Sequence, residues 1–239
     1  MEDWLNKVTY GNLSDYYLDI FKTKCIADAV IPILDEKYGS QLNFPLNNSE
    51  TVKQELDEMV GMVTSVNEQS NSDHLRRYVR YDRNLLQSII SAFTTKGIDV
   101  TDICESVFND ITPVIIKLKQ KYQRPRPYQL AQYYKLKLFP FNTKSGHTPS
   151  YPSGHTIQSY IILNIIGNKH PQAYGFCKKF IEDIAVSRVY LGLHYPSDND
   201  ASYIIAEEIM KLKPIVDKYK IWKNKKHQTH KTQKKNLEK

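Results

Sequence analysis

The chain has few cysteines, and their arrangement suggests no structural or metal-binding role. Only Cys25, Cys104 and Cys177 occur among its 239 residues. Their number is odd and their spacing is wide, so they fit neither a disulfide framework nor a metal-ligand motif. We therefore expect three reduced thiols, packed in the core of a cytoplasmic protein.

Long apolar segments are lacking as well. The longest apolar run, Tyr160–Ile166, is interrupted by Asn164, whereas a membrane-spanning helix needs about 20 apolar residues. The acidic start, Met1-Glu2-Asp3-Trp4, does not have the basic-then-apolar order of a secretory signal. These absences predict a soluble protein of the cytoplasm, or of the host cytoplasm if the source is viral.

Positive charge is concentrated at one end of the chain. The formal net charge is +7, and the segment Ile221–Lys239 contributes most of it through seven lysines against one glutamate. Such a polar, basic segment with few apolar residues is typical of a disordered tail. An inert solvated tail is the favoured interpretation, and contact with nucleic acid or an anionic surface is the alternative.

The rest of the chain has the composition and the patterning of one helical domain, residues 1–220. Hydrophobic residues make up 41% of the sequence, which suits a domain with a substantial core. Apolar residues recurring three and four apart predict helices at Tyr16–Leu34, from Ser49 to a break at Asn71, at Asp73–Thr95, from Thr101 through a kink or break at Pro113, and at Gly154–His170, Gln172–Tyr190 and Ser197–Tyr219.

No alternating strand pattern extends beyond a few residues, so the fold class is all-α, a bundle of about seven or more helices. Residues 1–48 form an N-terminal extension of uncertain structure, although a helix is expected within it. The segment Tyr128–Thr148 is expected to be a long surface connection that crosses the functional site.

The stretch Ser187–Asp198 carries the densest chemistry. Pro196 cannot continue a helix and Ser197 is a good N-cap residue, so we expect a turn between two helices there. His194 then lies in the turn, and Asp198 can reach back to its ring, fix the tautomer and leave the other nitrogen free to react. Arg188 adds a guanidinium group suited to a phosphate or carboxylate.

Two other stretches could contribute to the same site. Pro152-Ser153-Gly154-His155 opens a helix whose first N–H groups can bind an anion, with His155 in position to donate a proton. Lys119 and Arg126 lie near the end of another helix, and the prolines on both sides of Arg126 fix its backbone. Taken separately, each is compatible with an ordinary helix terminus.

In combination, the three stretches resemble the signature of the type 2 phosphatidic acid phosphatase superfamily, which includes bacterial acid phosphatases, lipid phosphatases and vanadium haloperoxidases. The resemblance covers Lys119–Asp198, about a third of the chain, and is greatest to the soluble bacterial-type non-specific acid phosphatases.

The first motif can be placed in two registers, because Lys117 with Arg124 also fits its spacing. Lys119 with Arg126 is preferred, because the Pro-aromatic pair that follows is typical of that branch. The resemblance implies a helical bundle of the acid phosphatase and haloperoxidase type.

The resemblance also implies roles for the residues of the signature. His194 is the nucleophile that forms a phosphohistidine, Asp198 orients its ring, and His155 is the acid and base. The phosphate would be held by three cationic side chains and two backbone N–H groups, those of Lys119, Arg126, Arg188, Ser153 and Gly154.

The sequence has no carboxylate cluster with metal-ligand spacing, so we expect a phosphatase of phosphate monoesters that needs no cofactor and is inhibited by vanadate. A vanadate-dependent haloperoxidase and a non-catalytic anion-binding protein are the alternatives. The specific ester, the oligomeric state and the source, viral or bacterial, stay open.

Overall fold

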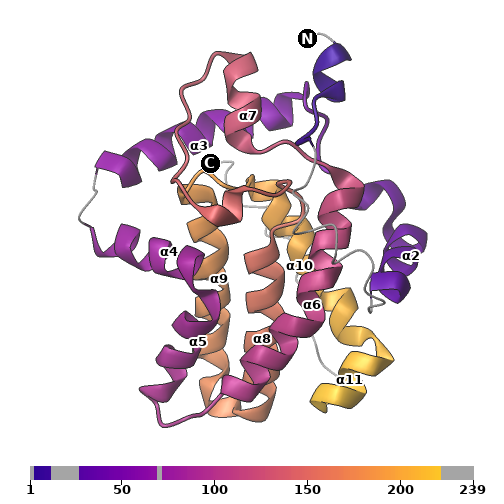
Figure 1. The fold of residues 1–239 in the computed structure, drawn as a ribbon, viewed down its shortest axis with the longest axis vertical. Helices are drawn as coiled ribbons and strands as arrows, with labels where there is room; N and C mark the ends of the chain where they lie inside the picture. The colour runs from indigo at the N-terminus through magenta and orange to yellow at the C-terminus, as the bar shows by residue number, and fades with distance from the viewer. Residues whose placement is uncertain (1–2, 12–26, 69–71, 222–239) are drawn as a thin grey trace, which may run out of the picture.

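The computed structural model describes residues 3–11, 27–68 and 72–221, and every regular element in these residues is helical (Figure 1). The α-helices are α2 (Ala27–Tyr38), α3 (Glu50–Glu68), α4 (Asp73–Arg83), α5 (Leu85–Thr94), α6 (Thr101–Tyr122), α7 (Pro127–Ala131), α8 (Gly154–Lys169), α9 (Tyr174–Tyr190), α10 (Pro196–Lys211) and α11 (Lys213–Tyr219). Short 3-10 helices are η1 (Asp3–Lys7), η2 (Gly39–Leu42), η3 (Gln132–Tyr134), η4 (Lys144–Gly146) and η5 (Pro171–Ala173). The all-α prediction is confirmed for these residues.

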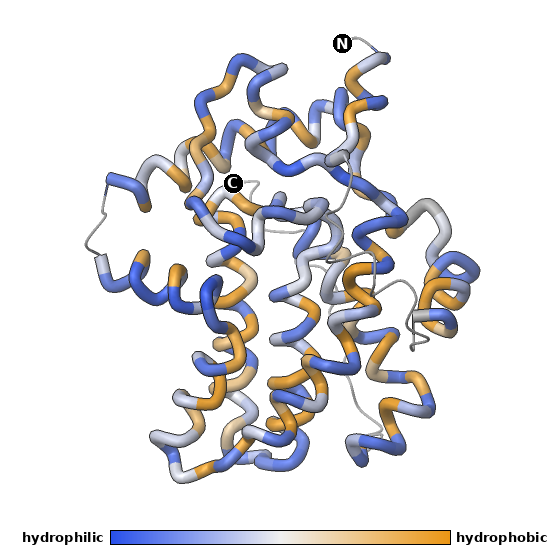
Figure 2. Tube along the Cα trace, in the orientation of Figure 1, coloured by the Kyte–Doolittle hydropathy of each residue, from blue (hydrophilic) through white to orange (hydrophobic). Residues whose placement is uncertain are grey.

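Helix α8 lies at the centre of the bundle because buried, mostly apolar residues occur on all of its sides. Ile157, Ile161, Ile162, Ile165 and Ile166 are at most 1% exposed, and α6, α9 and α10 pack against them. A helix that is apolar on every side is stable only in the interior. Figure 2 accordingly shows the apolar residues along α6, α8 and α9, whereas α3 and α4 are largely hydrophilic.

A second, smaller apolar cluster fixes α3 across the upper end of the bundle in the view of Figure 1. It joins Val52, Leu56 and Met59 of α3 to Leu130 of α7 and Val189 of α9. These α3 residues recur three and four apart, so one face of the helix is buried against the rest of the protein.

The expected helix at Asp73–Thr95 is two helices, and the prediction of one is wrong. Asn84 interrupts it with φ −155° and ψ 75°. The Asn84 side chain accepts the backbone N–H of Gln87 at 3.2 Å and thereby caps α5. Asparagine favours such a cap because its short side chain satisfies a free N–H at the start of the helix.

The expected helix at Ser197–Tyr219 is also two helices. Leu212 is extended, with ψ 133°, and separates α10 from α11, because Pro214 lacks the N–H that a continuous helix would need. The N-cap of α10 is Tyr195 rather than Ser197, with Pro196 at the first helical position. By contrast, α6 continues through Pro113, so the alternative of a break there is wrong.

Other boundaries agree with the sequence, and some predictions fall outside the described residues. Helix α3 begins directly after Ser49, and Gly97 adopts a φ of +70° in the turn that follows α5. Only residues 27–34 of the expected Tyr16–Leu34 helix are described, and α2 continues to Tyr38. Cys25 and the basic tail after Ile221 lie outside the described residues. Among the described helices, none has the length and apolar character that crossing a bilayer requires.

Truncation of a central side chain tests this arrangement. Ile161→Ala should lower the free energy of unfolding by about 2–5 kcal/mol, because it leaves a cavity that the surrounding helices cannot fill. Val186, on α9, is 43% exposed, so Val186→Ala should change stability by less than about 0.5 kcal/mol. Urea denaturation of both variants measures the difference, and equal losses would contradict the central position of α8.

Candidate active site

The buried charged side chains gather at one end of the bundle. In the part of the chain that the structure describes, all of them except Glu208 belong to a single cluster. Its members come from the five helices α3, α4, α6, α9 and α10 and from the links that follow α6 and α9: Glu55, Asp82, Lys119, Arg124, Arg126, Arg188, His194 and Asp198. Burial of charge is costly unless the groups are paired, so this concentration marks the site.

His194 and Asp198 meet as the sequence predicts. His194 follows α9, and its Nδ1 lies 3.1 Å from Oδ2 of Asp198 in the first turn of α10. Nε2 of His194 lies 3.0 Å from Nη1 of Arg126. Because a guanidinium group can only donate, Nε2 must be the acceptor and Nδ1 must carry the proton. The unprotonated nitrogen therefore faces Arg126, on the side opposite the carboxylate.

Arg126 is held in place mainly by backbone carbonyl groups. It donates to the carbonyl oxygens of Thr148 at 2.7 Å, Leu193 at 2.5 Å and Ser145 at 2.9 Å. Its backbone is the N-cap of α7, between the two prolines. Burial lowers the pKa of Arg126 to about 10, since carbonyl groups do not neutralise its charge.

Lys119 is buried beside the start of α8, and its side chain donates to backbone carbonyl oxygens. Its Nζ donates to Pro149 at 2.5 Å and Ser150 at 3.2 Å. Burial, followed by the proximity of Arg126, lowers the pKa of Lys119 well below its usual range. A Cβ on Gly154 would lie 4.0 Å from Cε of Lys119 and only 3.2 Å from Ile115, so glycine allows this close approach.

The geometry favours one of the two registers of the first motif. Lys119 and Arg126 lie inside the cluster, whereas Lys117 forms a surface ion pair with Asp28 at 3.1 Å. Arg124 is buried too, but it contacts the carboxylate of Asp198 at 2.6 Å instead of facing His194 Nε2.

Arg188, at the end of α9, has hydrogen-bonding capacity that its protein neighbours leave unused. Its Nη2 donates to Asp82 Oδ1 and to Ser145 Oγ, both at 2.8 Å. Its Nε and Nη1 are buried and have no hydrogen-bond partner among the described residues. Buried donors without partners are rare and costly, so these two groups indicate a ligand that accepts hydrogen bonds.

Asp82, the partner of Arg188, belongs to α4 and was not singled out from the sequence. Hydroxyl groups of Thr143 and Ser145 donate to its two oxygens. Burial alone would raise the pKa of Asp82, but Arg188 and the two hydroxyl groups lower it. The expected connection at Tyr128–Thr148 therefore reaches the site.

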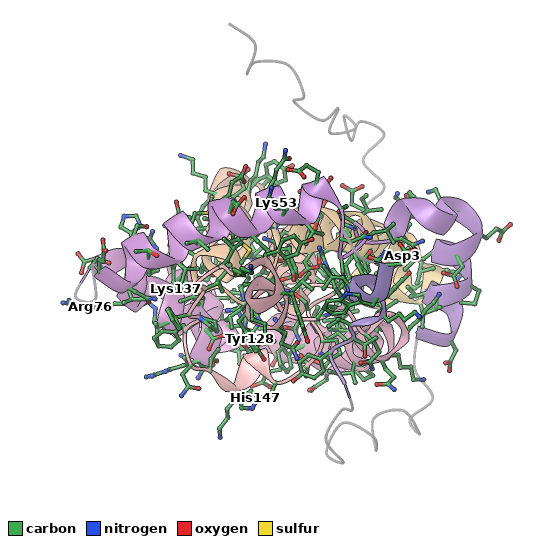
Figure 3. The ribbon with its side chains drawn as sticks, turned by 90° about the horizontal axis from the view of Figure 1, so that it is seen from above. Asp3, Lys53, Arg76, Tyr128, Lys137 and His147 are labelled. Carbon is green, nitrogen blue, oxygen red and sulfur yellow. The ribbon has the colours of Figure 1, made fainter. Side chains whose placement is uncertain are left out.

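A close backbone approach anchors this connection. The N–H of Phe141 donates to the carbonyl of Leu191 at 2.9 Å. Gly192 has a φ of +72°, and a Cβ there would lie 3.0 Å from Cα of Pro140. Only glycine both adopts a positive φ without strain and lacks the Cβ that would contact Pro140. Figure 3 shows His147, near the end of the connection, and Lys53 of α3 on opposite sides of the molecule.

His155 is partly exposed in the first turn of α8. Its Nε2 lies 3.4 Å from the backbone carbonyl of Asp82. Burial, together with the positive charge of Arg188, lowers the pKa of His155 to about 3. His155 also lines a cavity of about 240 Å³ with Phe108 and Gln158, so its ring has access to space outside the buried cluster.

The expected role of the Ser153 N–H group is not met in this structure. That N–H donates to the hydroxyl of Ser202 at 2.8 Å, and the Ser153 hydroxyl bonds to that of Thr156 at 2.8 Å. The hydroxyl of Ser202 lies close because the starts of α8 and α10 pack together. The sequence motif alone does not show that this second helix supplies a partner.

Sequence reasoning missed Glu55 and Asp82, although each carries a readable signal. Glu55 lies on the buried face of α3, next to Leu56 and three residues after Val52. Asp82 lies on the buried face of α4, four residues after Tyr78. An acidic residue inside an apolar stripe predicts a buried partner of opposite charge. No group of three or more His, Cys, Asp or Glu side chains that could hold a metal occurs within residues 3–11, 27–68 and 72–221.

Comparisons with known proteins add a family and a solved structure. A family model described as PAP2 superfamily matches residues 100–213, from the start of α6 to the start of α11. One matching solved structure is a transmembrane PAP2-type phosphatidylglycerolphosphate phosphatase from Bacillus subtilis. It is 17% identical, with a TM-score of 0.47, and the match covers 87% of this chain and 98% of that chain. No curated protein matches the chain significantly.

The protonation of the two histidines can be tested directly. Burial is the main cause that lowers the pKa of His194 well below its usual range, and the positive charge of Arg126 is the next. Both His194 and His155 should therefore be neutral at pH 6. Ring ¹⁵N NMR should show His194 with a proton on Nδ1 only. In urea the same residues should titrate near 6.5. Because the unfolded chain binds more protons, these groups should reduce stability as the pH falls below about 6.5. A proton on Nε2 of His194 in the folded protein would contradict the assignment.

Proposed function

We propose that the chain, whose residues 100–213 match the PAP2 superfamily model, is a phosphatase that hydrolyses phosphate monoesters through a phosphohistidine intermediate. This match supports the phosphatase activity in general. The single observation that carries the proposal is Arg188, whose buried Nε and Nη1 groups lack partners among the described residues. A phosphoryl group offers acceptor oxygens in the geometry that a guanidinium fork favours.

The charge balance of the cluster supports an anionic ligand. Four cationic side chains, those of Lys119, Arg124, Arg126 and Arg188, face three carboxylates, those of Glu55, Asp82 and Asp198. The pKa values of Lys119, Arg126 and Arg188 are all lowered, mainly by burial. A bound phosphate would supply the missing negative charge and stabilise all three cations.

His194 is the proposed nucleophile because its Nε2 is unprotonated and faces Arg126. On binding, the phosphoryl group takes over the hydrogen bond that Arg126 donates to Nε2. Nε2 then forms a bond to phosphorus as the ester P–O bond breaks. Asp198 accepts a hydrogen bond from Nδ1–H throughout and stabilises the positive charge that develops on the ring.

His155 is the proposed acid and base. It gives a proton to the leaving alkoxide, and afterwards takes a proton from the water that attacks phosphorus and breaks the P–N bond. Its lowered pKa leaves it neutral before substrate binds. The negative charge of a bound phosphate acts in the opposite direction to Arg188 and raises this pKa, so that His155 takes up a proton from solvent when the ester binds. The cavity beside His155 has space for the alcohol part of the ester, near Phe108 and Gln158.

The two histidines should respond differently to the leaving group. His194→Ala should abolish turnover and the covalent intermediate for every ester. His155→Ala should lose about 10²–10⁴-fold with an alkyl phosphate, and far less with an aryl phosphate whose leaving group needs no proton. Acid-quench trapping of labelled enzyme and rates on both esters are the measurements. Labelling of the His194→Ala variant, or the same leaving-group dependence in both, would refute the assignment.

Vanadate and chelation test the remaining parts of the proposal. Orthovanadate should inhibit competitively, because the cationic cluster suits a five-coordinate analogue of the transition state.

Excess EDTA should leave the rate unchanged, since the proposed roles belong to cationic and imidazole side chains. Activity that is lost in EDTA and restored by a divalent ion would overturn metal independence. Bromide peroxidation by the vanadate-loaded protein, without phosphatase activity, would instead indicate a haloperoxidase.

A further inference from the structure

Arg124 connects the site to a carboxylate that the reaction scheme above does not use. Its side chain is 1% exposed and lies between two acids, with Nη1 2.6 Å from Asp198 Oδ1 and Nη2 3.4 Å from Glu55 Oε2. The Tyr195 ring centroid lies 3.8 Å from the guanidinium carbon and that of Phe44 lies 5.0 Å from it. The aromatic rings shield the group from water and restrict its orientation.

Glu55 is itself fixed to the start of α10. Its Oε1 accepts the backbone N–H of Ser197 at 2.7 Å, and its Oε2 accepts the Ser197 hydroxyl at 3.0 Å. The same hydroxyl accepts a hydrogen bond from Arg124 at 2.9 Å. Glu55, Arg124, Asp198 and His194 thus form one continuous chain of contacts that ends at the nucleophilic ring.

The order of charges along this chain is significant. Asp198 and Arg124 alone would form a neutral pair, which would provide His194 with little electrostatic stabilisation. Glu55 adds a second negative charge, so that the group of three carries a net charge of −1. In a cluster with three other cations, this charge favours the positive ring that forms when His194 becomes phosphorylated.

We propose that Glu55, acting through Arg124, is a positioning residue that keeps the Asp198 carboxylate oriented and effectively negative toward His194. This inference rests on the proposed phosphohistidine chemistry. Glu55 lies on α3, outside the segment 100–213 that matches the superfamily. Helix α3 therefore helps to position the carboxylate that contacts the nucleophilic His194, in addition to covering the end of the bundle.

The experiment compares charge with shape at one position. Glu55→Gln preserves the shape and removes the charge, whereas Glu55→Asp preserves the charge and shortens the side chain. We expect Glu55→Gln to lower kcat about tenfold on an aryl phosphate, a change of about 1.4 kcal/mol in the barrier, with KM within about twofold and less trapped phosphoenzyme. Glu55→Asp should lie closer to the wild type. Glu58, exposed on the same helix, provides the matched control Glu58→Gln, which should behave as the wild type.

A spectroscopic measurement separates this inference from the proposed function. The Nδ1 proton of His194 should give a low-field ¹H resonance, which should move upfield and exchange faster in Glu55→Gln but not in Glu58→Gln. If no ester is hydrolysed by the wild type, the proposed function fails, and this resonance still tests the Glu55 link. An unchanged resonance, or a Glu55→Gln variant that is more active than Glu55→Asp, would overturn the inference.

Discussion

The structure depends on the pairing of charges that are buried away from water. A guanidinium, ammonium or carboxylate group in the interior is stable only when partners of opposite charge or well-placed dipoles surround it. Here Asp82 offsets Arg188, while Asp198 and Glu55 offset Arg124. Lys119 donates to two backbone carbonyl groups and forms no ion pair within the described residues. The cluster as a whole has four cationic side chains and three carboxylates.

The packing of the helices makes this concentration of charge possible. The apolar interior around α8 fixes the ends of α6, α8, α9 and α10 close together. The second apolar cluster then holds α3 over those ends. Because the apolar contacts supply the stability, the polar groups at the helix ends can be arranged for function at some cost in energy.

The site has two parts, the segment that matches the superfamily model and the helices before it. The segment 100–213 contains all the residues with proposed reactive or phosphate-binding roles. The helices before it contribute two carboxylates, Glu55 and Asp82, that contact arginines of this segment. Without them, the matched segment would have four buried cations and Asp198 as the one buried carboxylate within the cluster. The N-terminal helices are thus required for the charge balance of the site.

The sequence by itself determined the helical class, most helix boundaries, and the relation of His194 to Asp198, because each depends on residues close together in the chain. Helical periodicity and capping are local properties, and the carboxylate of Asp198 follows His194 by only four positions. Three features of the site were decided by the tertiary structure alone. Arg124 forms an ion pair with Asp198, the Ser202 hydroxyl accepts the Ser153 N–H, and Glu55 and Asp82 belong to the site. Those contacts join residues 49 to 106 positions apart, and the packing of distant helices, which no local pattern encodes, brings them together.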